Sequence, residues 1–206
     1  YSFNQTAGFS TLAYTGNQTS GAKLAHGLGV KPDMIITKSR AGASGWGVYH
    51  KSLGATYGML LNTTAAKDDD ATAWNDVEPD TVNITLGSSI NTNKTGTCVA
   101  YAFVEKQGYS KFGIYTGNGN ADGPFVFLGF KPAWLLRKRT DSTASTWLIH
   151  DSKRGFNSNA VRLRADLNNA EDSGNQVDLL SNGFKIRETG GYGNASGSPY
   201  IYMAFA

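Results

Sequence analysis

Three oxygen-bearing side chains at alternate positions form the first candidate site. Asn118, Asn120 and Asp122 stand just before Gly123, in the order N-x-N-x-D-G. This order is similar to the first half of a calcium-binding loop, in which amide and carboxylate oxygens bind a hard cation. The twelfth position of such a loop is a bidentate Glu, whereas here it is Gly129. We therefore predict a turn that caps a hairpin, with no metal and no cofactor, and keep the three side chains as candidates for ligand binding.

Flat aromatic side chains, which can stack on sugar rings, form the second candidate site. Trp46 and Trp147 lie in strand-like segments and recur in both halves of the chain, which predicts a place in the core. Trp74 follows three consecutive Asp residues in the segment DATAWND and has no counterpart in the second half. We therefore predict that Trp74 is exposed and contributes to a ligand-binding surface.

The residue types that catalysis requires are few and poorly spaced. The chain has four Glu, and no segment places two carboxylates on one face, as glycoside hydrolysis requires. It has no G-x-S-x-G nucleophile motif. His50 and His150 follow a Trp in each half, so we interpret them as equivalent structural residues. Cys98 is the single cysteine and is expected to be a buried thiol. We expect no catalytic residues and no enzymatic activity.

The composition excludes several classes of protein. The 206 residues include 25 Gly, 17% charged and 12% aromatic residues, with a net charge of +3. A charge-poor, Gly-rich chain of this kind is typical of short strands joined by turns. No apolar run is long enough to span a bilayer as a helix. The one basic cluster, residues 137–139, lies in a strand-like segment. We therefore expect neither membrane insertion nor nucleic-acid partners.

An internal repeat organises the chain and must position these candidates. The turn YTGN occurs at residues 14–17 and again at 115–118. NKTGT at 93–97 and NASGS at 194–198 each precede a final strand that contains Ala-Phe. Most matched residues differ by 100 to 102 positions. We predict two repeats of about 100 residues, 8–107 and 108–206.

Alternating apolar residues, separated by Gly-, Asn- and Ser-rich turns, predict strands throughout. The best helix candidates are short, at residues 64–70 and 167–172. The expected fold is all-β: an antiparallel β-sandwich of the jelly-roll or concanavalin A-like type. We favour one sandwich over residues 1–206, because each repeat has long polar loops and the repeats abut at residue 107 without a linker. Two small sandwiches in tandem are the alternative.

The paired motifs resemble a known family. The YTGN turns, the K-P strand openings at Lys31 and Lys131 and the terminal MAFA are, in combination, similar to a domain of unknown function found in virion proteins of tailed phages. That domain is common in tail-fibre and other tail-associated proteins of marine and cyanobacterial phages. The resemblance covers residues 8 to 206 and carries no known catalytic or binding residues. Because the chain starts at Tyr1 without Met, we expect a processed or excised part of a longer polypeptide.

The resemblance implies a structural, non-enzymatic virion protein with a lectin-like sandwich, located in the phage particle at the tail or capsid exterior. We expect a tail-fibre or tail-tip module that contacts the host surface or neighbouring subunits. The expected partners are other virion proteins, further copies of the chain (a trimer is favoured) and a host surface glycan. A carbohydrate-binding receptor-binding domain and a capsid decoration protein are the alternatives.

Overall fold

The computed structural model describes residues 1–154, 161–173 and 176–206. Nearly all of its regular structure consists of β-strands in antiparallel pairs, and the one helix within these ranges is the single turn α1 (Ala71–Trp74). The predicted all-β antiparallel sandwich is confirmed. Among the described residues, no helix has the length and apolar character needed to cross a membrane.

The chain divides into two compact units. Unit 1 comprises residues 1–62 and 67–106, and unit 2 comprises residues 63–66 and 107–206. The division after residue 106 falls within one residue of the predicted repeat boundary.

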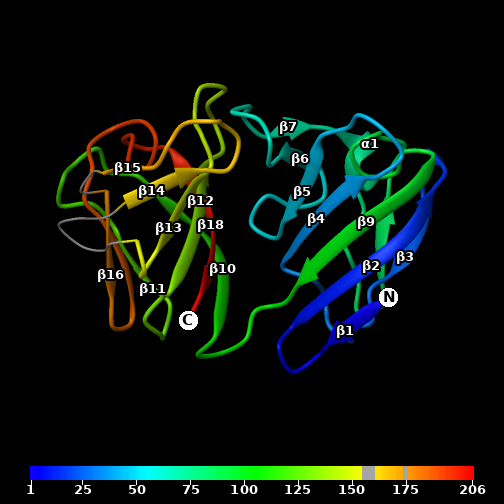
Figure 1. The fold of residues 1–206 in the computed structure, drawn as a ribbon, viewed down its shortest axis with the longest axis horizontal. Coiled ribbons are helices and arrows are strands. Elements are labelled where there is room, and N and C mark those ends of the chain that lie inside the picture. Colours follow the sequence, from blue (N-terminus) through cyan, green and yellow to red (C-terminus); the bar gives the residue numbers. More distant parts are fainter. Residues whose placement is uncertain (155–160, 174–175) are drawn as a thin grey trace. The chain divides into compact units, whose positions relative to one another are not determined.

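Unit 1 contains a main sheet in the order β1-β2-β9-β4-β5-β6-β7 and a small sheet of β3 and β8 (Figure 1). Its strands are β1 (Ser2–Asn4), β2 (Phe9–Gly16), β3 (Ala22–Ala25), β4 (Met34–Ser39), β5 (Trp46–His50), β6 (Tyr57–Leu60), β7 (Asp68–Asp69), β8 (Asn83–Leu86) and β9 (Gly96–Phe103). The main sheet is therefore assembled from strands far apart in the sequence, since β9 lies between β2 and β4.

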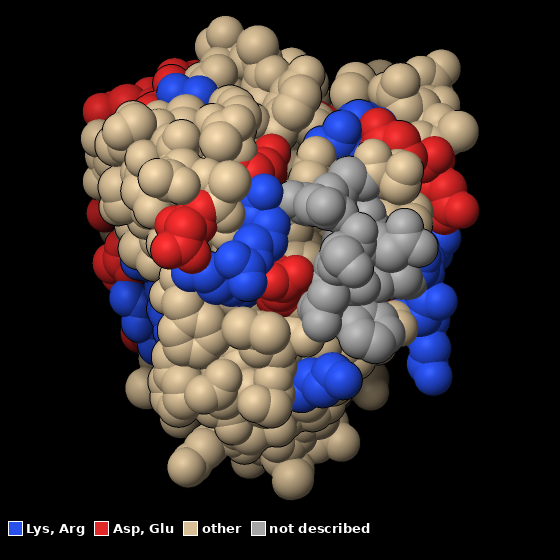
Figure 2. All heavy atoms as spheres, turned by 90° about the vertical axis from the view of Figure 1, so that its left-hand side faces the viewer, with Lys and Arg blue, Asp and Glu red and all other residues tan. Residues whose placement is uncertain are grey.

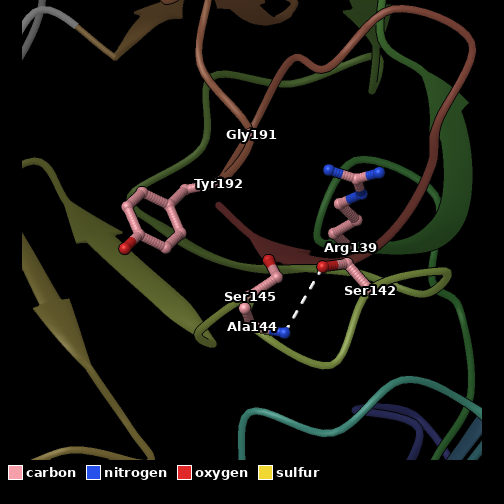
Figure 3. A pocket seen from close by; sticks show the side chains of 6 residues that line it. All are labelled: Arg139, Ser142, Ala144, Ser145, Gly191 and Tyr192. Atoms are coloured by element: carbon pink, nitrogen blue, oxygen red, sulfur yellow. Dashed lines mark hydrogen bonds between the residues drawn. The ribbon is translucent and has the colours of Figure 1, made fainter.

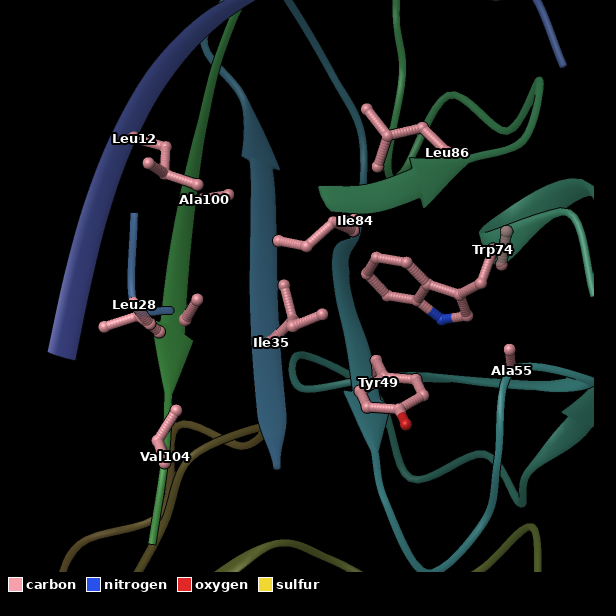
Figure 4. Close-up of a cluster of buried hydrophobic side chains, with 12 residues drawn as sticks. Leu12, Leu28, Ile35, Tyr49, Ala55, Trp74, Ile84, Leu86, Ala100 and Val104 are labelled. Carbon is pink, nitrogen blue, oxygen red and sulfur yellow. The ribbon is translucent and has the colours of Figure 1, made fainter. Parts of the chain in front are cut away.

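The core of unit 1 lies between these two sheets (Figure 4). The register pairs Leu12 with Ala100 and Ile35 with Ala102, which places all four side chains on one face of the main sheet. Ile84 of β8 closes the core from the small sheet. All five are almost completely buried. A large apolar side chain contributes about 1.5–3 kcal/mol when fully buried, so this face holds the two layers together.

Unit 2 repeats this plan. Its main sheet has the order β10-β18-β12-β13-β14-β15, and its small sheet has the order β11-β17-β16. Its strands are β10 (Ser110–Thr116), β11 (Phe125–Phe127), β12 (Trp134–Arg139), β13 (Leu148–Asp151), β14 (Val161–Arg164), β15 (Asp172–Ser173), β16 (Val177–Leu180), β17 (Gly183–Ile186) and β18 (Pro199–Phe205). In its core, Phe184 makes edge-on ring contacts with Tyr115 at 6.0 Å and Tyr202 at 5.4 Å.

The strand orders of the two units match. β2-β9-β4-β5-β6-β7 of unit 1 corresponds to β10-β18-β12-β13-β14-β15 of unit 2. Each unit has its own cluster of buried apolar side chains. This division favours two sandwiches in tandem over the single sandwich preferred from the sequence. Buried aromatic rings supply each repeat with more core than its polar loops suggested.

Neither of the two short helix candidates forms a helix. Within residues 64–70 the chain forms β7, and Asp70 only caps the start of α1. Residues 167–172 form no helix, and Asp172 belongs to β15. Neither segment has an apolar stripe that would bury one side of a helix, so strand pairing and turns prevail.

Candidate functional site

Trp74 is not an exposed ligand-binding residue, and this prediction is wrong. The residue ends α1 and is only 1% exposed. Its ring packs edge-on against Tyr49, with 5.9 Å between the ring centroids (Figure 4). The Asp70 side chain accepts a hydrogen bond from the Thr72 nitrogen at 2.9 Å and starts the helical turn that directs Trp74 inward. Trp74 is therefore part of the unit 1 core.

The two strand tryptophans differ in burial. Trp147 is 1% exposed, which confirms its predicted place in the core. Trp46 is only half-buried, and the Lys38 ammonium lies 5.8 Å from its ring centroid. The core prediction therefore holds fully for Trp147 alone.

Asn118, Asn120 and Asp122 do lie together, in a self-bonded turn. The Asn120 nitrogen donates to Asn118 Oδ1 at 3.0 Å, and the Asp122 nitrogen donates to Asn120 Oδ1 at 2.9 Å. The Asp122 carboxylate pairs with Lys185 Nζ at 2.8 Å, and this contact lowers the pKa of Asp122. The amide oxygens that would bind a cation or sugar are thus already hydrogen-bonded. The ligand-binding role of these residues stays a prediction.

A buried asparagine, Asn194, holds the turn at residues 118–122 in place through hydrogen bonds to its backbone. Asn194, the first residue of NASGS, is completely buried. Its Oδ1 accepts a hydrogen bond from the Asn118 nitrogen at 2.9 Å. Its Nδ2 donates to the backbone oxygens of Asn120 at 2.7 Å and Glu188 at 2.6 Å. One side chain therefore joins three loop segments of unit 2.

The corresponding residue of NKTGT has the same role in unit 1. Asn93 Oδ1 accepts from the Asn17 nitrogen at 3.0 Å. Its Nδ2 donates to the oxygens of Thr19 at 3.0 Å and Gly87 at 2.8 Å. Because buried polar groups must be hydrogen-bonded, both asparagines are structural anchors for the loops at this end of each sandwich.

The two histidines that the sequence pairs are not equivalent. Met34 begins β4 and Trp134 begins β12, yet His50 pairs with Met34 whereas His150 pairs with Leu135. The two rings therefore project to opposite faces of their sheets, since a shift of one residue reverses the face. The Trp residues match at a distance of 101, so His150 aligns with a tyrosine rather than with His50.

Unit 2 contains a buried ion pair that sequence patterns did not reveal. Arg137 is fully buried in the core, and its Nη2 donates to Glu188 Oε1 at 2.8 Å. Its Nη1 donates to the Tyr115 hydroxyl at 3.2 Å. A side chain at Gly193 would meet Nη1 at 1.7 Å, so only glycine leaves room for this guanidinium. Burial raises the pKa of Tyr115 to about 12, although Arg137 opposes the shift.

A hollow of about 270 Å³ opens in unit 2 at the end of β12 (Figure 3). It is formed by the loop after β12 and the loop before β18. The residues that line it are Arg139, Ser142, Ala144, Ser145, Gly191 and Tyr192. None of these described residues carries a carboxylate, and the polar groups they offer are a guanidinium, two hydroxyls and a tyrosine ring.

None of these six residues was predicted as a site residue. A comparison of the two repeats could have identified two of them from the sequence, because Arg139 corresponds to Ser39 of unit 1 and Tyr192 corresponds to Asn91. Arg139 and Ser39 each end a strand, β12 and β4, whereas Tyr192 and Asn91 each lie in the loop before the last strand of their repeat.

Charged side chains near β14–β17 are neutralised locally. Asp172 accepts hydrogen bonds from Arg162 Nε at 2.5 Å and Arg164 Nη2 at 2.7 Å, and these contacts lower its pKa to about 2. Figure 2 shows basic side chains lying against acidic ones on this side of the molecule. Within the part of the chain that the structure describes, no group of three His, Cys, Asp or Glu side chains is arranged to hold a metal.

These features define the class: an antiparallel β-sandwich protein with two units of matching strand order, each anchored by a buried asparagine. The chain belongs to the family DUF7483, a domain of unknown function that matches residues 1–206. Neither a comparison with curated proteins nor one with solved structures found a match.

Proposed function

We propose that this chain is a non-enzymatic structural module on the exterior of a tailed-phage virion. In this role its loops contact the host surface or neighbouring subunits. The observation that carries the proposal is the pair of buried anchors, Asn93 and Asn194, which hold the loops at one end of each sandwich. A rigid β scaffold that presents fixed loops is a common basis for recognition surfaces. The similarity of the paired YTGN and K-P motifs to a phage virion domain supports the location.

Within the virion, a tail fibre or tail tip is the proposed place. A homotrimer is the proposed assembly, because homo-oligomers mostly have closed symmetry and fibres are often three-fold. Capsid decoration is the alternative. Copy number distinguishes the two, since decoration requires hundreds of copies per particle and a fibre requires tens or fewer.

Immunogold labelling of purified virions tests the location. An antibody against this chain is expected to label the distal tail, with tens of copies or fewer per particle by quantitative mass spectrometry. Labelling over the whole capsid would favour decoration. If the antibody detects the chain in infected cells but labels no part of the particle, the proposal is wrong.

A carbohydrate-binding role is the second candidate. It no longer rests on Trp74, which is buried, but on the hollow beside Tyr192 in unit 2.

A further inference from the structure

We infer that the hollow at the end of β12 binds a carboxylated sugar residue, such as the uronic acid unit of an acidic polysaccharide. This inference concerns a binding site of unit 2 and does not depend on where in a virion, or in any other assembly, the chain is placed.

Ser145 is the first observation that indicates a ligand. The residue is 2% exposed, and its hydroxyl makes no hydrogen bond within the described part of the chain. Figure 3 shows this hydroxyl directed into the space between Tyr192 and Arg139. An unpaired buried hydroxyl costs stability, and native structures rarely retain one without a bound partner. A hydroxyl group of a ligand would supply that partner.

Arg139 supplies the charge preference. Its Nε donates to Asp141, which raises the pKa of Arg139 and leaves both terminal amino groups outside this pair. A guanidinium offers parallel donors that match a carboxylate. Because none of the described residues that line the hollow is acidic, a carboxylate of the ligand would be the partner of the terminal amino groups of Arg139.

Tyr192 supplies an aromatic face. The residue is 44% exposed, whereas five other aromatic residues of unit 2 belong to its buried core cluster. Figure 3 shows the ring on the opposite side of the hollow from Arg139. Aromatic faces pack against the apolar C–H face of a sugar ring, which a simple anion does not have. A ligand that uses both walls therefore combines a ring with a carboxylate.

The size of the hollow limits the ligand. Pockets for drug-sized ligands measure roughly 300–1,000 Å³, and this hollow, at about 270 Å³, lies just below that range. It accommodates one sugar residue, with any neighbouring residues of the chain extending into solvent.

Unit 1 provides an internal comparison. There the residue that corresponds to Tyr192 is Asn91, and its Oδ1 accepts a hydrogen bond from the Gly45 nitrogen at 2.6 Å. A side chain at Gly45 would also meet Leu60 at 2.9 Å. The two loops of unit 1 are thus joined by a side chain at the position where unit 2 has an open hollow. The difference indicates that unit 2 has diverged for binding.

The inference is tested by measuring binding of the full chain to a panel of acidic oligosaccharides and to their carboxyl-reduced forms, in which each carboxylate becomes a primary alcohol. Binding is expected for at least one acidic oligosaccharide, with affinity at least about tenfold weaker after reduction. Backbone NMR shifts on addition of D-glucuronate or D-galacturonate are expected at residues 139–145 and 190–193, and D-glucose or D-galactose should produce much smaller shifts.

Three variants locate the site. Ser145→Ala removes a hydroxyl that has no protein partner, so it should preserve the fold and weaken binding. Tyr192→Asn introduces the residue of unit 1, and Arg139→Gln removes the charge; each should weaken binding about tenfold or more. Arg40→Ala, which removes an exposed arginine of unit 1, is the matched control and should leave binding unchanged.

The inference is overturned if the folded chain binds none of the acidic panel, if carboxyl reduction leaves affinity unchanged, or if the three variants bind like the original. Virion labelling can succeed or fail independently of these results, so the site and the proposed function are judged separately.

Discussion

Asn93 and Asn194 show how single residues can be structural in both units, while neighbouring positions diverge. Each asparagine is buried and uses both its donor and its acceptor on loop backbone. Arg137 and Thr37 occupy corresponding positions but make different contacts. Arg137 forms a buried ion pair with Glu188, whereas Thr37 Oγ1 donates to the backbone oxygen of Asn91 at 2.9 Å. The anchors are common to the repeats, and the side chains around them give each unit its own interior.

Replacing Asn194 with alanine is expected to lower the free energy of unfolding by about 2–3 kcal/mol, because the backbone groups of Asn118, Asn120 and Glu188 lose a buried partner. Urea denaturation followed by circular dichroism measures the change. Asn169→Ala, at an exposed position, is the control and should differ by less than about 0.5 kcal/mol. Equal stability of the two variants would contradict the anchor role.

His26 predicts a pH dependence. The ring is buried: its Nδ1 accepts from the Leu28 nitrogen at 3.2 Å, and its Nε2 lies 3.1 Å from the Asp80 oxygen. Burial lowers the pKa of His26 below the ordinary 6.5, so the unfolded chain binds the proton more readily than the folded one. The contribution of His26 to the free energy of unfolding is therefore complete above about pH 6.5, the pKa of the unfolded chain. It decreases as the pH falls from there toward the lower pKa of the folded chain, by at most about 1.4 kcal/mol per pH unit for one proton.

Urea denaturation at pH 7, 6 and 5 measures this slope. His26→Gln should be less stable at pH 7 and should show a shallower loss between pH 7 and 5. Part of the slope should remain, because burial also lowers the pKa of His150. A slope that is identical in the variant and the original would contradict the assignment.

At the scale of elements, the end of the first long strand of each repeat packs against the turn that precedes the last strand of that repeat. Gly16 ends β2, and a side chain there would come within 2.1 Å of the Lys94 oxygen. Gly117 follows β10, and a side chain there would come within 2.3 Å of the Ala195 oxygen. Both glycines allow the backbone of one segment to lie directly against the turn before the final strand, which explains why YTGN recurs with its glycine.

Gly117→Ala is expected to destabilise the chain by about 1–3 kcal/mol, because the turn at residues 194–198 must move away. Hydrogen exchange should become faster in that turn. Thr116→Ala, at the exposed neighbouring position, is the control and should leave exchange there unchanged. Unchanged protection of residues 194–198 in Gly117→Ala would show that the close approach is not required.

At the scale of the whole molecule, each unit has its own core. The buried cluster of unit 1 includes Leu12, Ile35 and Ile84, and that of unit 2 includes Leu135 and Phe184. Each cluster is formed by a main sheet and a small sheet of the same unit. Local stability should therefore follow the unit in which a residue lies.

Phe184→Ala should lower stability by about 3–5 kcal/mol and reduce hydrogen-exchange protection first in the strands of unit 2. Ile84→Ala is the matched variant and should reduce protection first in unit 1, at a cost of about 2–5 kcal/mol. Peptide-level exchange measured by mass spectrometry distinguishes the two patterns. Equal loss of protection in both units from either variant would show that they unfold as one body.

The sequence alone predicted features that depend on local physics. Alternating apolar residues predicted strands throughout the chain, and motifs that recur 100 to 102 residues apart placed the repeat boundary at residue 107, next to the division between the units after residue 106. The run from Asn118 to Asp122 was recognised as a turn because Asn and Asp side chains bond to backbone two residues away. These features are set by neighbours along the chain.

Only the tertiary structure decided which way certain side chains face and what they meet. Trp74 was expected in solvent, but a single helical turn directs it into the core. His50 and His150 were paired by sequence, but strand register places them on opposite faces. The hollow requires Arg139 and Tyr192, more than fifty residues apart, to lie on opposite walls. Such contacts depend on how distant strands are paired, and no local pattern encodes that pairing.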